Sequence, residues 1–142
     1  MDNLAVDIAL YFDTPEKCDA FIRIYDDMAE TISRELRVAV DELYDNECPQ
    51  YCQLVGTADD FPGKKALTYL SEIPGVDRIE IWYEGGDRDM GQLFFTPGES
   101  AVDCYYLPFA FKPEGEYDCE KISEAYDKHK VMERIALENM WE

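Results

Sequence analysis

The longest hydrophobic pattern in this chain predicts a helix over residues 13–45. Apolar residues recur every three or four positions along this stretch, as they do in a helix that lays one face across a core. The stripe consists of Cys18, Phe21, Ile22, Tyr25, Met28, Ala29, Ile32, Leu36, Ala39, Val40 and Leu43. Thr14 can cap the first N–H groups, Pro15 suits the first helical position, and Glu16 complements the positive helix end.

The second half of this stretch has an alternative. An unbroken helix would be about 45 Å long, which is long for a chain of this size. A break near residues 31–35 would allow Leu36, Val38 and Val40 to form a strand. Because Leu36, Val40 and Leu43 fit the helical stripe better, we expect the helix to continue, with the break as the alternative.

Alternation of apolar and polar residues predicts strands in the rest of the chain. The predicted strands cover residues 5–12, 51–57, 76–84, 92–96 and 101–107. The last three are joined by turns rich in glycine and proline, so we expect an antiparallel meander. Two further helices are predicted, one from Lys64 to Ile73 and one that Asp118 caps and that runs to the C-terminus.

These elements predict a single α+β domain over residues 1–142. We expect a largely antiparallel sheet of about four to five strands. The long N-terminal helix, the short middle helix and the C-terminal helix are expected to pack on one face of it. The chain contains no internal repeat, low-complexity tract or long linker that would divide it.

The net charge of the chain limits the classes of molecule that it is expected to bind. The chain has 32 acidic residues against 13 basic residues, a formal net charge of −19. Such a charge repels nucleic acid and anionic membranes, and it attracts basic proteins and speeds their encounter. We therefore predict no direct binding of nucleic acid or membrane. The alternative explanation is that the charge only keeps the protein soluble.

The N-terminus and the cysteines indicate a cytoplasmic protein. Residues 1–3 lead into the first strand without a basic region or a small-residue cleavage site, and no apolar run is long enough to span a bilayer. The five cysteines are an odd number, which favours reduced thiols over a disulfide framework.

Candidate catalytic, metal and cofactor chemistry is weak. His129 is the single histidine, and it lies within the apolar stripe of the last predicted helix. Cys48 and Cys52 are separated by three residues, which matches neither a redox motif nor a complete zinc signature. Asp87 and Asp89 lack the remaining ligands of a calcium loop. We predict no catalytic residues, no metal and no cofactor.

The candidate partner-binding residues are acidic side chains without an opposite charge nearby in sequence. Several lie in loops, where recognition usually takes place. The predicted set is Asp26, Asp27, Asp45, Glu47, Asp59, Asp60, Glu84, Asp87 and Asp89. Aromatic residues such as Tyr44, Tyr51 and Tyr117 interrupt this acidic surface and suit a protein interface.

The leading functional hypothesis is a non-enzymatic acidic binding or inhibitor protein. Its partner would be a basic nucleic-acid-binding protein or a nuclease, engaged by nucleic-acid mimicry as in anti-restriction, anti-CRISPR or toxin-immunity proteins. One alternative is a structural or oligomeric module, with Val131 and Ile135 on the polar side of the last helix as a second contact surface. Another is a small hydrolase that uses paired carboxylates.

Overall fold

The computed structural model describes residues 4–45, 49–59, 63–85, 90–97, 102–108, 112–128 and 133–135. They form β1 (Leu4–Phe12), α1 (Pro15–Leu36), β2 (Ala39–Asp45), β3 (Tyr51–Ala58), α2 (Lys64–Ser71), β4 (Val76–Glu84), β5 (Met90–Pro97), β6 (Val102–Pro108), α3 (Cys119–Lys128) and β7 (Glu133–Ile135).

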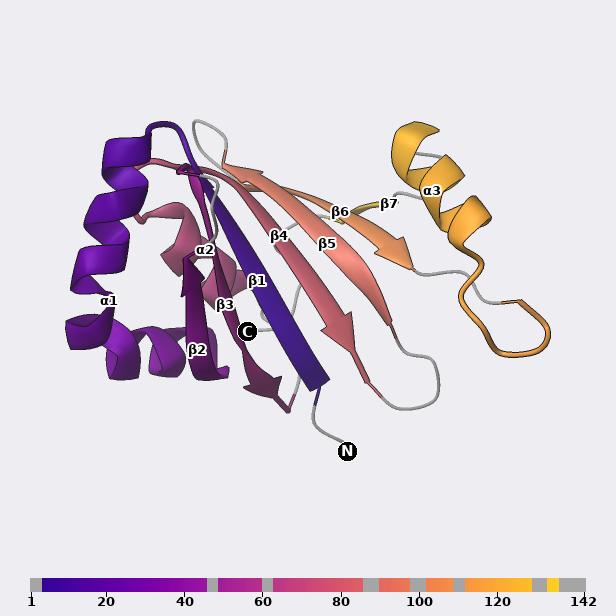
Figure 1. The fold of residues 1–142 in the computed structure, drawn as a ribbon, viewed down its shortest axis with the longest axis horizontal. Helices are drawn as coiled ribbons and strands as arrows, with labels where there is room; N and C mark the ends of the chain where they lie inside the picture. The colour runs from indigo at the N-terminus through magenta and orange to yellow at the C-terminus, as the bar shows by residue number, and fades with distance from the viewer. Residues whose placement is uncertain are drawn as a thin grey trace.

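All strands belong to one antiparallel sheet, which confirms the α+β class (Figure 1). The strand order is β2-β3-β1-β4-β5-β6-β7 over the described residues. In the described part of the chain the sheet has seven strands where about four to five were predicted, because β2 and β7 come from segments that were expected to be helical. The β4-β5-β6 meander is confirmed.

The first four strands form a βαββαβ unit. α1 lies in the connection from β1 to β2, and α2 lies in the connection from β3 to β4. Each connection passes over one intervening strand, so that β1 lies between β3 and β4. This is the split βαβ arrangement of ferredoxin-like domains. Because that fold serves many unrelated functions, it assigns none to this chain.

The hydrophobic core lies between one face of the sheet and the helices α1 and α2. Ile8 of β1 is fully buried and pairs with Leu54 of β3 and Ile81 of β4, both also buried. Phe21 of α1 and Leu67 of α2 belong to the same cluster. Because side chains alternate along a strand, the intervening residues of β1, β3 and β4 lie on the opposite face, away from α1 and α2.

The expectation that the first helix continues to Asp45 is wrong. α1 ends at Leu36, and Arg37 adopts the left-handed conformation of a helix C-terminus, with φ 55°. The Ser33 hydroxyl then accepts a hydrogen bond from the Val40 N–H at 3.3 Å. The segment after the break pairs with β3, as in the alternative. Backbone pairing with a distant strand therefore outweighs the local helical pattern.

The C-terminal region also differs from the prediction. α3 begins as expected, because the Asp118 carboxylate accepts a hydrogen bond from the Lys121 N–H at 3.1 Å. The helix ends at Lys128, and residues 133–135 form β7 on the edge of β6, so Ile135 is not on a helix. Pairing of residues 133–135 with the outer edge of β6, whose backbone groups would otherwise lack strand partners, accounts for this difference. Val131 and residues 136–142 lie outside the described residues.

The predicted packing of three helices on one face holds only for α1 and α2. Both contribute buried residues to the core cluster. In Figure 1, α3 lies beyond the β6–β7 edge of the sheet, at the end of the molecule opposite α1. The two ends of the molecule are therefore built from different helices.

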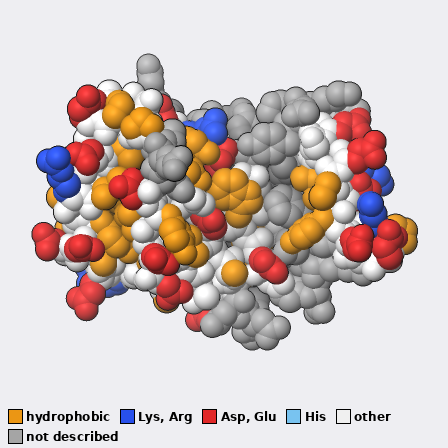
Figure 2. Space-filling view, in the orientation of Figure 1, with side chains coloured by type: hydrophobic (Ala, Val, Ile, Leu, Met, Phe, Trp, Pro, Cys, Tyr) orange, Lys and Arg blue, Asp and Glu red, His pale blue; other side chains and the backbone are white. Residues whose placement is uncertain are grey.

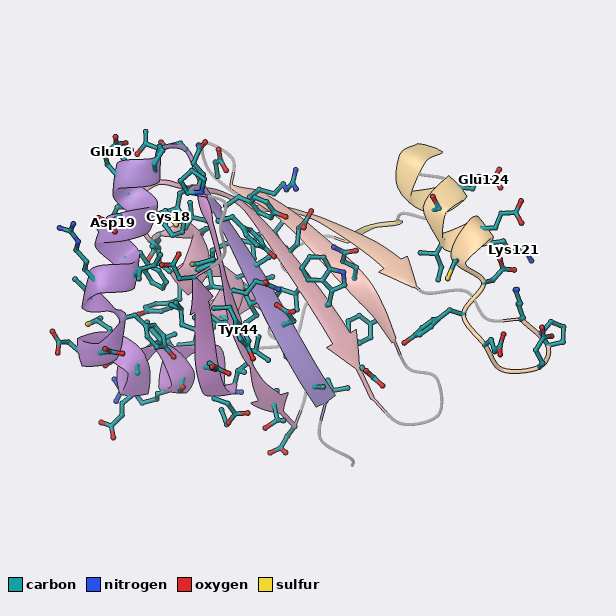
Figure 3. All side chains as sticks on the ribbon, viewed as in Figure 1. Glu16, Cys18, Asp19, Tyr44, Lys121 and Glu124 are labelled. Atoms are coloured by element: carbon teal, nitrogen blue, oxygen red, sulfur yellow. The ribbon has the colours of Figure 1, made fainter. Side chains whose placement is uncertain are left out.

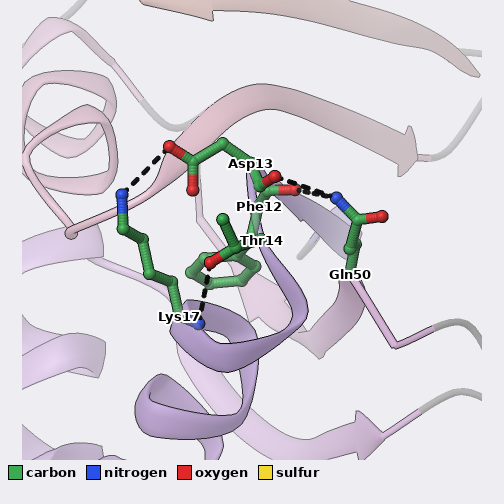
Figure 4. A network of polar contacts seen from close by, with 5 residues as sticks. All are labelled: Phe12, Asp13, Thr14, Lys17 and Gln50. Carbon is green, nitrogen blue, oxygen red and sulfur yellow. Dashed lines mark hydrogen bonds and ion pairs between the residues drawn. The ribbon is translucent and has the colours of Figure 1, made fainter.

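Replacing Thr14 with alanine is expected to lower the free energy of unfolding by about 1 kcal/mol. The Thr14 hydroxyl accepts a hydrogen bond from the Lys17 N–H at 3.2 Å at the start of α1 (Figure 4). Urea denaturation would measure the loss. Thr31→Ala, the same change within α1, is the control and should be neutral or stabilising, because alanine favours a helix interior. Equal effects of both changes would contradict a capping role.

Candidate partner-binding face

The structure does not gather the five described members of the predicted acidic set into one site. Asp26, Asp27, Asp45, Asp59 and Glu84 are described, and all are exposed. Asp26 and Asp27 lie on α1, whereas Asp45 pairs with Cys52 at the beginning of β3. Asp59 follows the other end of β3, at the end of the sheet where Glu84 lies. Their role in binding stays a prediction.

The remaining predicted acidic residues, Glu47, Asp60, Asp87 and Asp89, lie outside the described residues. Figure 2 shows acidic side chains mainly around the rim of the viewed face, with hydrophobic side chains between them. Figure 3 places Glu16 and Asp19 on α1 and Glu124 on α3, at opposite ends of the molecule. Because the acidic side chains are spread in this way, charge alone does not single out one face.

A second group of residues does share one surface, the face of the sheet opposite α1 and α2. We call it the tyrosine face. It consists of Glu42, Tyr44, Tyr51, Gln53, Val55, Asp7, Tyr11, Arg78, Glu80, Trp82 and Gln92. Residues opposite each other on neighbouring strands share a face, so the register alone places them together.

The centre of the tyrosine face holds a buried carboxylate. The Glu80 side chain is 2% exposed, and its Oε2 accepts a hydrogen bond from the Tyr11 hydroxyl at 2.9 Å. Its Oε1 pairs with Arg78 Nη2 at 3.0 Å. The Arg78 guanidinium also lies 4.2 Å from the centroid of the Tyr11 ring. A guanidinium is therefore held between an aromatic ring and a carboxylate, which both attract it.

Tyr51 extends this cluster onto β3. Its ring centroid is 4.8 Å from that of Tyr11, with the planes tilted by 42°. Burial, followed by the neighbouring Tyr11 hydroxyl and then the carboxylates of Asp7 and Glu80, raises the pKa of Tyr51 to about 12. Burial also raises the pKa of Tyr11. Both hydroxyls are therefore neutral at pH 7, and they act as hydrogen-bonding and stacking groups.

Asp7 lies on the same face one step further along β1. Gln53 Nε2 lies 2.8 Å from each oxygen of its carboxylate. Burial raises the pKa of Asp7, and the hydrogen bond from Gln53 opposes this shift. The carboxylate is therefore fixed in position by an amide, without an ion pair to a described basic residue.

Tyr44 and Glu42 form the exposed edge of the tyrosine face on β2. The Tyr44 side chain is 46% exposed, and Figure 3 labels it. A hydrogen bond to Glu42, followed by the Glu42 charge, raises the pKa of Tyr44. Within the described ranges, no lysine or arginine forms an ion pair with Glu42. This pair resembles Tyr11 and Glu80 in its chemistry, but it lacks an arginine.

Gln92 occupies the β5 side of the tyrosine face. It pairs with Trp82 of β4 and is 2% exposed. Its Nε2 atom has no hydrogen-bond partner in the part of the chain that the structure describes. A buried donor without an acceptor costs about 1–3 kcal/mol. The amide is thus a group that an additional acceptor would stabilise.

The described residues do not bring together the other candidate chemistry, that of a metal site or a reactive cysteine. Among the described residues, no three His, Cys, Asp or Glu side chains are close enough to hold a metal ion. Burial raises the pKa of the Cys52 thiol, so it is a poor nucleophile at neutral pH. Cys48 and His129 lie outside the described residues. No helix in the described ranges is long and apolar enough to cross a membrane.

The sequence analysis named Tyr44 and Tyr51, but it did not identify the other residues of the tyrosine face. The alternation in residues 76–84 already puts Arg78, Glu80 and Trp82 on one side of a strand. Charged residues at alternate positions of a strand flanked by other strands were the available signal.

Comparison of the chain with protein-family models, curated proteins and solved structures gave no match.

Proposed function

We propose that this chain is a non-enzymatic acidic binding protein, and that its partner is a basic protein such as a nuclease or another nucleic-acid-binding protein. The observation that carries the proposal is the tyrosine face, where aromatic rings adjoin carboxylates, in a chain of net charge −19. Aromatic rings provide contact area at low entropic cost, and carboxylates select cationic partners.

The sign of the charge decides between nucleic acid and protein as the partner. Sheets that bind single-stranded RNA stack bases on aromatic side chains, and basic residues nearby hold the phosphates. Here the Tyr11 and Tyr51 rings are in tilted contact on neighbouring strands, but the flanking charges include Asp7, Glu42 and Glu80. Phosphates are repelled by such a surface, whereas lysine and arginine side chains are attracted to it.

The exposed acids outside the tyrosine face support nucleic-acid mimicry. Asp26, Asp27 and Glu30 are exposed on α1. They extend the negative field beyond the sheet and favour encounter with a basic groove that otherwise binds DNA or RNA. The protein would then act as an inhibitor by occupying that groove. The reduced thiols of Cys18, Cys52 and Cys119 support a cytoplasmic location.

A second candidate is a structural or oligomeric module whose charge maintains solubility. The spread of acidic side chains around the rim in Figure 2 favours it. Such a protein would associate with itself or a neutral partner, and its binding would vary little with salt.

A retention and competition experiment tests the proposed function. The protein is immobilised, host lysate is applied at low salt, and bound proteins are eluted with rising salt. We expect basic nucleic-acid-binding proteins to elute, and the purified partner to release labelled DNA when this protein is added. The protein alone should not shift DNA in a gel. Direct DNA binding, or retention that is independent of salt, would contradict the proposal.

A further inference from the structure

We propose that the tyrosine face binds an arginine of an extended segment in the partner protein, with the guanidinium against the Tyr44 ring and the carboxylates of Glu42 and Asp7. This inference rests on the proposed function and specifies its site. The occupant is a peptide segment that carries arginine, rather than a nucleic acid or a second copy of this chain.

The chain already contains one example of the contact. Arg78 lies over the Tyr11 ring at 4.2 Å while it pairs with Glu80 at 3.0 Å, and the Tyr11 hydroxyl donates to the same carboxylate. A planar guanidinium can stack on a ring and pair with a carboxylate at the same time, whereas a lysine ammonium is a compact point charge. This arrangement therefore selects arginine.

Tyr44 and Glu42 repeat this combination without the cation. Tyr44 and Glu42 lie two residues apart on the same face of β2, and Glu42 is close enough to raise the pKa of the Tyr44 hydroxyl. Tyr44 pairs with Gln53, which holds Asp7 through both carboxylate oxygens, so a second negative group lies close by. Glu42 and Tyr44 are both exposed, and no described basic side chain forms an ion pair with Glu42.

The register defines the path of the remaining segment. Glu42, Val55, Asp7, Trp82 and Gln92 are successive partners in one row across β2, β3, β1, β4 and β5. Four strand spacings amount to about 19 Å, the length of about six extended residues. Glu42 at the β2 end of this row is exposed, whereas Gln92 at the β5 end is only 2% exposed, so the segment contacts the row from its β2 end.

The test uses fluorescent arginine and lysine hexapeptides of equal charge, with association and dissociation measured separately at several salt concentrations. We expect the arginine peptide to bind the wild-type protein about tenfold more tightly than the lysine peptide. Equal affinity would mean attraction by charge alone and would overturn the inference. A single-stranded RNA oligonucleotide of the same length should not bind, and its binding would overturn both the inference and the proposed function.

Variants with the same loss of charge locate the site. Asp7→Asn/Glu42→Gln and the single variant Tyr44→Leu should speed dissociation of the arginine peptide about tenfold. The control variant is Glu114→Gln/Glu116→Gln, because both residues are exposed and lie before α3 at the far end of the molecule. It should only slow association of the peptide and flatten the salt dependence of the association rate. Circular dichroism would confirm that each variant is folded.

Asp26→Asn/Asp27→Asn separates the inference from the proposed function. Suppose that Asp26→Asn/Asp27→Asn speeds dissociation of the arginine peptide, whereas Asp7→Asn/Glu42→Gln and Tyr44→Leu do not. The inference is then wrong, while a basic partner remains supported. If neither peptide binds the wild-type protein and the lysate yields no basic partner, both the inference and the proposed function fail.

Discussion

Replacing Gly56 with alanine is expected to lower the free energy of unfolding by about 3 kcal/mol, the upper end of the usual cost of overpacking. Gly56 of β3 lies opposite Val40 of β2, beside a bulge between Val40 and Glu42. A Cβ atom here would press on the Ala39 carbonyl group, 2.8 Å from its carbon and 2.9 Å from Val40 Cα. These are backbone atoms, so no side-chain rotation relieves the contact, and β2 must move away from β3.

Urea denaturation would measure the loss, and hydrogen exchange would locate it. The amides of β2 should lose protection before those of β1, because only β2 is pushed outward. Thr57→Ala, at the next and exposed position of β3, is the control and should cost less than about 1 kcal/mol. Unchanged stability and intact protection of β2 in Gly56→Ala would show that the close approach of the two backbones is not required.

The strands that were predicted most closely have two faces with different surroundings. β4 matches residues 76–84 in full, because Ile79 and Ile81 are buried against the helices while Arg78, Glu80 and Trp82 lie on the other face. A strand with one buried face and one polar face has alternating apolar and polar residues, so the local sequence predicts it. The same reasoning correctly gave β1 and the meander.

The segment after α1 could not be assigned from local pattern. Leu36 and Leu43 keep a helical spacing, although the helix ends at the first and the second lies in β2. The deciding interactions are the hydrogen bond from Val40 N–H to the Ser33 hydroxyl and the pairing of β2 with β3. Strands that pair across a long stretch of sequence leave no periodic signal in the local sequence. The strand β7 was predicted as helix for the same reason.

The tyrosine face was only partly visible in the sequence for a related reason. Tyr44 and Tyr51 stand out as aromatic residues in an acidic stretch, but nothing local joins them to residues of β4. Tyr11 contacts Arg78 and Glu80 only because β1 pairs with β4. Tyr11 and Glu80 are 69 residues apart in the sequence. The burial of Glu80 and Gln92 is likewise a property of the assembled sheet.

Replacing Arg78 with methionine is expected to lower the free energy of unfolding by about 2 kcal/mol. Glu80 would keep the hydrogen bond from Tyr11 but lose the only described cation that pairs with its buried carboxylate. Removing one partner of a fully buried pair costs about 3–5 kcal/mol. The Arg78 side chain is 48% exposed, so water compensates part of the loss and the expected effect is smaller. Methionine preserves much of the aliphatic packing against Tyr11.

Arg23→Met provides the matched control, because Arg23 pairs with Asp19 at 2.9 Å where both side chains are largely exposed. It should change stability by less than about 0.5 kcal/mol. Adding Glu80→Gln to Arg78→Met should recover part of the loss, since a neutral amide is less costly to bury than an unpaired carboxylate. Urea denaturation of the two single variants and the double variant measures this coupling. If Arg78→Met is no more damaging than Arg23→Met, Arg78 does not stabilise the buried carboxylate, and the internal example of arginine recognition loses its energetic basis.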